Sequence, residues 1–439
     1  MARDEVRARR LGRRSVEERV ARLCTPVDVE RVGSTLAGTG SLAGGRRVGI
    51  VATDGTAEQG SFDALGARAA ADLVRRCSVE GVPVVLLLDS SGARLSGGVD
   101  AVVANAELLG ALAEASGRVP LLAGVFGFAA GSAAYALALC DLAFAVAQRS
   151  FVFVAGPPVV EAALGSSADV YGLGGTEVHL RSGLLAGEVI DDDALIDHLL
   201  KVVHFLPACA WSLPAHADAV AAAGALELPA DLRATWDGRK AVDAVLDAGS
   251  EIPLGTGSGG SALTSLGRVD GQALALVASQ PRVLGGALDA SAARKVARFV
   301  RFAAAFNLPV VTLCDTPGFL PGADQEARHV LIDGASVVSA YVEARSTVPL
   351  VAVVLRRAIG AGTVLVLGAH VLYGLPGAEI AHMGAGAARA AGGTGEASPS
   401  PLRTVQARDL RESVVKALLD APRPKPAAAG SRKTCLVPL

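Results

Sequence analysis

The sequence predicts an α/β protein built from two tandem copies of one domain, related by internal duplication. A chain of 439 residues is too long for one compact core and suggests two domains of roughly 150–200 residues each. Hydrophobic residues make up 51% of the chain and charged residues 19%, a balance that excludes a disordered or collagen-like protein. The duplication is visible as two pairs of matching segments, 81–92 with 307–318 and 119–131 with 348–360.

The matching segments keep a regular spacing, which supports a true repeat. GVPVVLLLDSSG aligns with NLPVVTLCDTPG at an offset of 226 residues, and VPLLAGVFGFAAG aligns with VPLVAVVLRRAIG at an offset of 229. A helical stretch precedes each first segment, at 64–76 and at 292–305. Each copy is therefore predicted to contain a polar hairpin, a helix, an apolar strand ending in Asp, a helix, an apolar strand, a glycine-rich turn and a helix. Short aliphatic runs between helices are typical of a sheet covered on both faces.

Composition suggests where the domains begin and end. Residues 1–25 alternate Arg with Glu, Leu and Val and are predicted to form a surface helix; a transit peptide is the alternative, which the acidic residues disfavour. The first domain is predicted over 26–207, and an Ala- and Pro-rich linker over 208–237. The second domain is predicted over 238–439, with a Gly-, Ala-, Ser- and Pro-rich stretch after about Gly384 and a further helix over 407–419.

Charge and hydropathy exclude two classes of partner. A net charge of −2 offers nothing that would attract nucleic acid or an anionic membrane. The segment Val119–Cys140 carries no charge and is long enough to span a bilayer. However, it contains a proline and three glycines, and the second copy has Arg356 and Arg357 in the equivalent stretch. We therefore predict a buried strand, turn and helix there, and no membrane partner.

Cysteine usage points to a reducing compartment. The six cysteines are scattered, with no CxxC pair and no Cys/His pair at metal-ligand spacing. This pattern excludes a zinc ribbon and argues against a disulfide framework. We predict a cytoplasmic protein without a metal site.

A glycine-rich turn follows the second apolar strand of each copy. The turns are Ala130–Ala133 (AGSA) and Gly360–Thr363 (GAGT). Small residues let a ligand approach the backbone, and the first N–H groups of a helix have no partner within the helix. Such N–H groups can hold a carbonyl oxygen as it becomes an enolate or a tetrahedral oxyanion. The alternative is that small residues only permit tight packing of the strand against the helix, and the sequence leaves both open.

Other motif matches carry less weight. Gly255–Gly260 fits G-x-G-x-x-G, but no strand is predicted before it and a strand follows, so we interpret it as a loop. Ser132 lacks the G-x-S-x-G pattern of a hydrolase nucleophile. His179 follows two glycines and is the most suggestive histidine, although a lone histidine is more often structural than catalytic.

Acidic residues in three places have structural interpretations. Asp89 and Asp315 end the buried strands, where a carboxylate usually caps the next turn rather than acting as a base. The run Asp191–Asp193 is interpreted as the solvated start of a helix.

The most informative motifs resemble a known family. Asp89–Leu95 (DSSGARL) resembles the DSGGARI signature of the carboxyltransferase β-subunits of biotin-dependent acyl-CoA carboxylases, such as propionyl-CoA carboxylase. The most specific match is Asp315–Gly322 (DTPGFLPG), followed by Gln325 and Glu326. Further matches lie in the family's order at 127–141, 153–160, 173–179, 279–281 and 288–301. The resemblance covers about 48–384.

The resemblance implies a fold, an assembly and a catalytic site. It implies two crotonase-like domains of the ββα-spiral type and a homo-oligomer, a ring-shaped hexamer that is a trimer of dimers. The active site would lie between the first domain of one subunit and the second domain of another. The thioester oxygen of an acyl-CoA would accept from the amides of Gly131 and Ser132, and the ureido oxygen of carboxybiotin from Ala361 and Gly362.

The resemblance also implies which residues line the two binding sites. Positions on the acyl-CoA side are Ser91, Gly92, Ala93, Arg94, Ala134, Tyr135, Gly156, Pro157 and Val364. Of these, Val364 matches the position that shapes the acyl pocket. Positions on the carboxybiotin side are Phe319, Leu320, Pro321, Gly322 and Gln325. The only methionines are Met1 and Met383, so a Met-Lys-Met biotinylation site is absent. Carboxybiotin is therefore expected on a separate biotin carboxylase/biotin carrier subunit, with none bound covalently here.

Three functions remain open from the sequence. The first is a carboxyltransferase subunit that moves a carboxyl group from carboxybiotin to the α-carbon of a short acyl-CoA, through an enolate held in oxyanion holes. The second is a biotin-independent decarboxylase of a malonyl-type thioester, which would use the same enolate. The third is a non-catalytic assembly subunit that keeps the fold and binds a partner.

Overall fold

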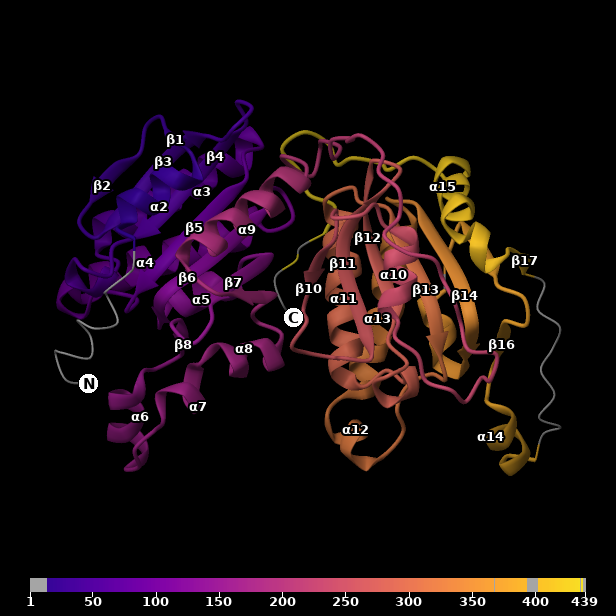
Figure 1. The fold of residues 1–439 in the computed structure, drawn as a ribbon. Helices are drawn as coiled ribbons and strands as arrows, with labels where there is room; N and C mark the ends of the chain where they lie inside the picture. Colours follow the sequence, from indigo (N-terminus) through magenta and orange to yellow (C-terminus); the bar gives the residue numbers. More distant parts are fainter. Residues whose placement is uncertain (1–13, 367, 393–401, 435, 437–439) are drawn as a thin grey trace. The chain divides into compact units, whose positions relative to one another are not determined.

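The computed structural model describes residues 14–366, 368–392, 402–434 and 436, and the chain divides into two compact units (Figure 1). Unit 1 comprises Met1–Ser212 and Ala427–Leu439, and unit 2 comprises Leu213–Pro426. Most of the predicted linker therefore belongs to unit 2. Its Leu226 and Trp236 are buried in the hydrophobic core of that unit.

Unit 1 is built on a nine-stranded sheet. Its strands are β1 (Thr25–Pro26), β2 (Glu30–Val32), β3 (Thr35–Ser41), β4 (Arg47–Thr53), β5 (Val84–Ser90), β6 (Leu121–Ala130), β7 (Leu142–Val146), β8 (Phe151–Phe153) and β9 (Gly187–Val189). β3 and β4 form an antiparallel hairpin, and β4, β5, β6, β7 and β9 then lie parallel in that order. The short strand β8 lies parallel beside the carboxyl end of β6, with Phe153 paired with Ala130.

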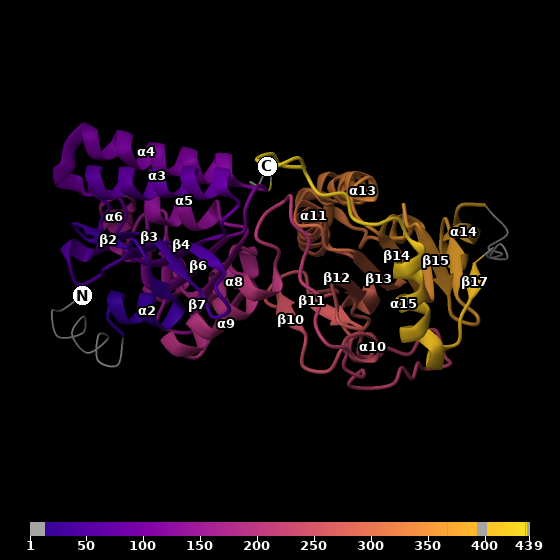
Figure 2. The same ribbon diagram turned by 90° about the horizontal axis from the view of Figure 1, so that it is seen from above.

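Helices cover both faces of this sheet. They are α2 (Val16–Leu23), α3 (Ala64–Glu80), α4 (Gly98–Ala115), α5 (Ser132–Ala138), α6 (Pro157–Leu164), α7 (Val170–Gly174), α8 (Thr176–Ser182) and α9 (Asp192–Phe205), with 3₁₀ turns at Glu58–Gly60 and Leu95–Gly97. Figure 2 shows α3 and α4 side by side on one face and α2 and α9 on the other. Because both faces are covered, the central strands are continuous runs of buried Val, Leu and Ala rather than alternating patterns.

Unit 2 repeats this plan on an eight-stranded sheet. Its strands are β10 (Ile252–Leu254), β11 (Ala262–Val269), β12 (Gln272–Ser279), β13 (Val310–Thr316), β14 (Leu350–Ile359), β15 (Val371–Gly374), β16 (Glu379–Ala381) and β17 (Arg403–Thr404). Its helices are α10 (Arg239–Val245), α11 (Ala290–Ala305), α12 (Ala323–Ala327), α13 (Val330–Arg345), α14 (Ala385–Ala390) and α15 (Leu410–Asp420), with 3₁₀ turns at Leu284–Gly286, Gly360–Leu365 and Ala407–Asp409. In Figure 2, α11 and α13 cover one face of the sheet, and α10 and α15 cover the other.

The predicted duplication is confirmed down to single hydrogen bonds. In unit 1 the Phe62 N–H donates to Gly92 O at 2.8 Å, and in unit 2 the Leu288 N–H donates to Gly318 O at 2.9 Å. These pairs keep the offset of 226 residues seen in the sequence. In each copy the segment before the first long helix (α3 or α11) is thus bonded to the loop after β5 or β13. The order of hairpin, helix, strand, helix and strand is the same in both units.

The N-terminal helix is held by a buried ion pair that the sequence did not predict. Residues 1–13 of the predicted helix lie outside the described residues, and α2 begins at Val16, with Ser15 as its capping residue. Arg19 on α2 and Asp192 on α9 are 3% and 4% exposed, and their side chains lie 3.2 Å apart. The expectation that Asp191–Asp193 is wholly solvated is therefore wrong for Asp192, because an arginine distant in sequence neutralises it where it is buried.

The last segment of the chain packs on unit 1 rather than on the second domain to which it was assigned. The Ala427 N–H donates to Ala210 O at 3.0 Å, and the Leu436 N–H donates to the hydroxyl of Ser116 at 2.9 Å. Gly117 makes a close approach there, since a Cβ at this position would lie 2.0 Å from Thr434 O. The chain therefore returns to unit 1 after completing unit 2.

The uncharged segment Val119–Cys140 forms β6, a glycine turn and α5, as predicted. A different segment, Leu95–Ala115, is the one helix within the described ranges that is long and apolar enough to cross a membrane. Its helix α4 packs beside α3 on the same face of the sheet.

Candidate functional site

The glycine turn of unit 1 lies at the carboxyl end of its parallel strands. Gly131 follows β6 and has φ 54° and ψ −122°, a backbone conformation that only glycine adopts without strain. Its N–H donates to Phe153 O of β8 at 3.1 Å, which anchors the turn on one side. This N–H, one of the two predicted to hold the thioester oxygen, is therefore already engaged, and Ser132 is left to supply the donor. α5 then begins at Ser132. In open parallel sheets, ligands bind at this end of the strands.

The DSSG segment after β5 packs directly against this turn. Gly92 has φ 93°, and a Cβ there would lie 2.4 Å from Ala130 O and 3.2 Å from the nitrogen of Ser132. Ser90 accepts a hydrogen bond from the Gly92 N–H at 3.1 Å and so fixes the loop. Within the described part of the chain, the N–H of Ser132 donates to no acceptor. The structure thus brings Gly92, Gly131 and Ser132 together around an available N–H donor.

Unit 2 builds the same turn from different residues. Gly360 has φ 53°, matching Gly131, and a Cβ on Gly362 would lie 2.6 Å from the methyl group of Thr316 and 3.3 Å from the Cα of Gly318. Gly318 thus packs against the second turn as Gly92 packs against the first. The predicted helix at the turn is a 3₁₀ helix, Gly360–Leu365, whereas the one in unit 1 is the α-helix α5. Thr363 donates its hydroxyl to Gly360 O at 2.8 Å, and two glycines in one turn disfavour a regular α-helix.

The other predicted acyl-CoA residues, apart from Val364, belong to segments of unit 1 next to the first turn, and they differ in exposure. Ser91 is exposed, while Ala93 and Arg94 are half-buried, and the Arg94 side chain donates to Ser61 Oγ at 3.3 Å. Of the two predicted positions on α5, Ala134 is buried and Tyr135 is 53% exposed. Two more, Gly156 and Pro157, start α6 just beyond β8, the strand that holds Gly131. The last, Val364, belongs to the second turn, where it is half-buried.

The predicted carboxybiotin residues form the loop after β13 and the start of α12. Phe319 places its ring against Gly334 of α13, where a Cβ would lie 3.1 Å from the ring. Leu320 donates its N–H to Leu288 O at 2.8 Å, and Pro321 and Gly322 are exposed. Gln325 is buried, and its side-chain oxygen accepts from the Ala290 N–H at 3.0 Å. That side chain therefore holds the start of α11.

A buried charged cluster behind the second turn was missed by sequence reasoning. The carboxylate of Asp315 is 0% exposed and accepts from Trp236 Nε1 at 2.7 Å and from Arg356 Nε at 2.8 Å. Arg357 adds an ion pair at 3.4 Å. Asp315 therefore pairs with arginines instead of only capping the next turn as predicted. The two arginines in an apolar strand were a visible signal, because a buried arginine needs an acidic partner.

Two other singled-out residues have structural partners. His179 Nε2 lies 2.8 Å from Val152 O of β8, which matches the structural interpretation of this histidine. Asp89 accepts the N–H of Phe128 at 3.1 Å. The Gly255–Gly260 segment is a turn, as predicted, although the short strand β10 does precede it.

A largely buried lysine fastens this glycine-rich turn. Lys295 on α11 donates to Gly255 O at 3.2 Å and to Ser258 O at 2.7 Å. Burial lowers the pKa of Lys295 to about 8, and the carboxylate of Asp289 partly opposes this shift. The folded protein therefore releases this proton more readily than the unfolded chain.

We expect Lys295 to make stability depend on pH above neutrality. Between about pH 8 and the unfolded pKa of about 10.5, the unfolded chain binds more protons, so the free energy of unfolding rises with pH. Relative to Lys295→Met, the wild type should gain about 1–3 kcal/mol across this interval, as measured by urea unfolding at several pH values. The matched variant Lys240→Met, at an exposed lysine, should show a flat difference. An equally flat difference for Lys295→Met would contradict the expectation.

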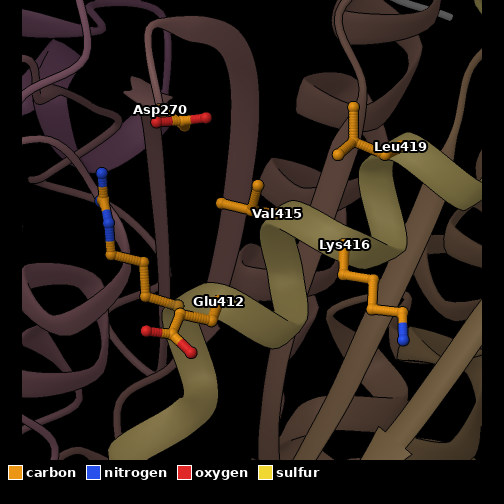
Figure 3. Close-up of a pocket in the computed structure, with 6 residues that line it drawn as sticks. Asp270, Glu412, Val415, Lys416 and Leu419 are labelled. Carbon is orange, nitrogen blue, oxygen red and sulfur yellow. The ribbon is translucent and has the colours of Figure 1, made fainter.

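Unit 2 also has a shallow hollow. Its volume is about 280 Å³, and Figure 3 shows it between the β11–β12 turn and α15. It is lined by Asp270, Arg411, Glu412, Val415, Lys416 and Leu419. Arg411 is already engaged, with Asp247 at 2.6 Å. None of the predicted site residues lines this hollow, so it is distinct from the two turns.

Two units of one fold, each carrying a glycine turn at the carboxyl end of its sheet, define a carboxyltransferase with crotonase-like domains. Residues 15–394 match the carboxyl transferase domain, and the chain belongs to that family. It is a carboxyltransferase subunit of the acyl-CoA carboxylase type, a transferase that moves a carboxyl group between biotin and an acyl-CoA.

Several relatives place the chain within this family. It is 35% identical over 365 residues to the propionyl-CoA carboxylase carboxyltransferase subunit of Haloferax mediterranei, covering 80% of this chain and 70% of the relative. It is 31% identical over 404 residues to the methylmalonyl-CoA carboxyltransferase 12S subunit of Propionibacterium freudenreichii, covering 85% and 76%. It is also 34% identical over 356 residues to the methylmalonyl-CoA decarboxylase subunit alpha of Veillonella parvula, covering 78% and 70%.

A solved structure has the same fold over nearly the whole chain. The transcarboxylase 12S structure with methylmalonyl-coenzyme A and methylmalonic acid bound has a TM-score of 0.88 and 28% sequence identity. The match covers 98% of this chain and 94% of that one. The predicted family and its fold are thereby confirmed.

Proposed function

We propose that the chain carboxylates the α-carbon of a short acyl-CoA, with the thioester oxygen held at the Gly131–Ser132 turn by the N–H of Ser132. In this proposal Ala361 and Gly362 receive the ureido oxygen of carboxybiotin. The observation that carries the proposal is the match between the two turns: Gly131 and Gly360 have φ values of 54° and 53°, and each turn is backed by a glycine of the preceding loop.

The first turn suits charge that develops on a thioester oxygen. The N–H of Ser132 is available to donate, and Gly92 leaves the backbone beside it uncovered. A donor fixed before the reaction stabilises an enolate oxygen without having to reorganise. Ser132 then acts through its backbone, in keeping with the absence of a nucleophile motif around it.

The second turn fits a ureido carbonyl by the same argument. Gly318 and Gly362 pack closely against each other. Because both are glycines, neither places a side chain in front of the turn. Bound carboxybiotin would supply the transferable carboxyl group and, once that group has left, a basic ureido nitrogen for the α-proton. The chain's own residues bind and orient the two substrates and hold the negative charge, so no strong protein base is required.

The partners in this proposal are an acyl-CoA, a biotin carboxylase/biotin carrier subunit and further copies of this chain. The relative named above, transcarboxylase 12S, is described as a hexamer. In this chain Val99 and Val102 of α4, and Leu331, Ile332 and Val342 of α13, are each more than half exposed. These helices occupy equivalent places in the two copies. We propose that they are covered in a trimer of dimers.

The proposed location is the cytoplasm. Four cysteines among the described residues are free and buried: Cys24, Cys77, Cys209 and Cys314. Burial raises the pKa of Cys77 to about 12, which keeps that thiol protonated and unreactive. Free buried thiols accord with a reducing compartment.

The test is a carboxylation assay with the full chain and a supplied biotin carboxylase/biotin carrier subunit. Acetyl-, propionyl- and butyryl-CoA are offered with bicarbonate and ATP, and the carboxylated product is measured. The proposal expects product that depends on the biotin carrier. Absence of product with all three thioesters, from a chain shown to bind the carrier, would overturn it.

A second candidate function is decarboxylation, because one relative is named a methylmalonyl-CoA decarboxylase subunit. The same oxyanion turn would hold the enolate that remains when CO₂ leaves. Incubation with malonyl-CoA or methylmalonyl-CoA in the absence of biotin separates the two functions. Steady CO₂ release would favour decarboxylation, and titration calorimetry without acyl-CoA binding would favour an assembly subunit.

A further inference from the structure

A buried asparagine lies behind the first glycine turn and is absent from the second. Asn105 of α4 is 3% exposed, and its side-chain oxygen accepts the hydroxyl of Ser132 at 2.7 Å. Its amide nitrogen donates to Ala101 O at 2.8 Å and to Phe62 O at 3.3 Å. One side chain thus joins three segments of unit 1: the long helix α4, the segment before α3 that contains Phe62, and the first residue of α5.

Asn105 is also connected to Ser132 by a second route, through Phe62 and the DSSG loop after β5. Phe62 O also accepts the N–H of Arg94 at 2.9 Å, and the N–H of Phe62 donates to Gly92 O at 2.8 Å. Gly92 in turn lies against the nitrogen of Ser132. Asn105 therefore supports Ser132 directly through the hydroxyl and indirectly through the loop that faces its N–H.

The duplicated copy shows what the fold does without this support. At the offset of 229 residues, Asn105 corresponds to Gly334 and Ser132 corresponds to Ala361. The ring of Phe319 lies against Gly334 in place of a polar side chain. The fold therefore does not require a polar pair behind the turn, and the pair in unit 1 needs a different explanation.

We propose that Asn105 is a positioning residue for the oxyanion site of unit 1, acting through the hydroxyl of Ser132. The hydrogen bond restricts the Ser132 side chain, and because that side chain shares its Cα with the donating N–H, it also restricts the direction of the N–H. Since this N–H is the donor assigned above, the inference rests on the proposed function. Small misplacements of such a donor are costly, because stabilisation depends on alignment with the developing charge.

The test is a double-mutant cycle in which kcat and KM are measured for carboxylation. Asn105→Ala and Ser132→Ala each remove the same hydrogen bond, and each should lower kcat about 10-fold with KM changed less than about 3-fold. The double variant should be no slower than either single variant.

A control on α4 separates positioning from stability. Leu112 is fully buried on the same helix, and Leu112→Ala should lower the free energy of unfolding by about 2–5 kcal/mol while kcat stays at the wild-type value. Loss of kcat in Leu112→Ala to the same degree as in Asn105→Ala would mean that kcat merely follows stability. An unchanged kcat in Asn105→Ala, or equal and additive losses in the cycle, would equally overturn the proposal.

A readout without catalysis distinguishes this inference from the proposed function. Amide hydrogen exchange of the segment 131–135 should be faster in Asn105→Ala than in wild type, with no further increase in the double variant. If the wild type carboxylates no thioester but this exchange pattern is seen, the proposed function fails and the link from Asn105 to the turn stands. If the wild type is active but exchange at 131–135 is unchanged in Asn105→Ala, the inference fails alone.

Discussion

Replacing Asp315 with alanine is expected to destabilise unit 2 by about 3–5 kcal/mol, because it leaves Arg356 buried without its counter-charge. Asp315 is completely buried and Arg356 is 4% exposed, so water cannot take the place of the carboxylate. The same substitution also removes the acceptor for Trp236 Nε1. Arg356 would keep its hydrogen bonds to Asp231 O and Ala234 O and its contact with the Trp236 ring, none of which carries a negative charge. Urea unfolding of the full chain measures the loss.

A double variant and a surface control make this prediction specific. Asp315→Leu with Arg356→Met replaces the pair with apolar groups and should recover much of the stability, since apolar replacement of a whole buried pair is often neutral or better. Asp324→Ala breaks an exposed ion pair with Arg328, in which both side chains are 67% exposed, and should cost no more than about 1 kcal/mol. Equal losses for Asp315→Ala and Asp324→Ala would show that burial of the cluster is energetically unimportant.

Gly131→Ala is expected to lower kcat for carboxylation by about 10²–10³-fold, the usual loss when one oxyanion donor is removed. The φ of 54° and ψ of −122° at Gly131 are strained for any residue with a Cβ, so the turn must shift, and the donating N–H of Ser132 changes direction with it. Steady-state kinetics in the reconstituted carboxylation assay measures the effect. Gly360→Ala tests the second turn in the same way.

The matched control for this prediction is a glycine with positive φ elsewhere in the same unit. Gly44 lies in the β3–β4 turn with φ 87° and no atom within 4 Å of the position a Cβ would take. Gly44→Ala should therefore incur backbone strain but leave kcat unchanged. A folded Gly131→Ala protein whose kcat stays within about threefold of wild type would remove the turn from the catalytic site.

Much of the fold could be predicted from short stretches of sequence. The sequence repeat predicted two apolar strands in each copy, a helix between them and a glycine after the second strand. The structure has these elements where they were expected, with Gly131 after β6 and Gly360 after β14. These features are local: a run of β-branched residues or a glycine at a turn depends on the few residues around it. Gly92 and Ser132 were named as site residues from the family motifs, and the structure shows that Gly92 lies beside the nitrogen of Ser132.

The features that differed from expectation depend on residues far apart in the chain. Arg19 and Asp192 are separated by 173 positions, and Trp236 and Asp315 by 79, so no periodicity relates them. The 3₁₀ helix after Gly360 and the return of the chain to unit 1 after Ala427 likewise depend on tertiary packing.

Sequence alone was enough to establish the duplicated α/β architecture and its two glycine turns, because apolar runs and glycines act over a few neighbouring residues. Which polar groups pair inside that architecture was decided by the folded chain. Asn105 and Ser132 are 27 residues apart and meet only when α4 packs beside the turn. A buried polar atom must find a partner wherever the closing fold puts one, and that partner is set by three-dimensional proximity rather than by spacing along the chain.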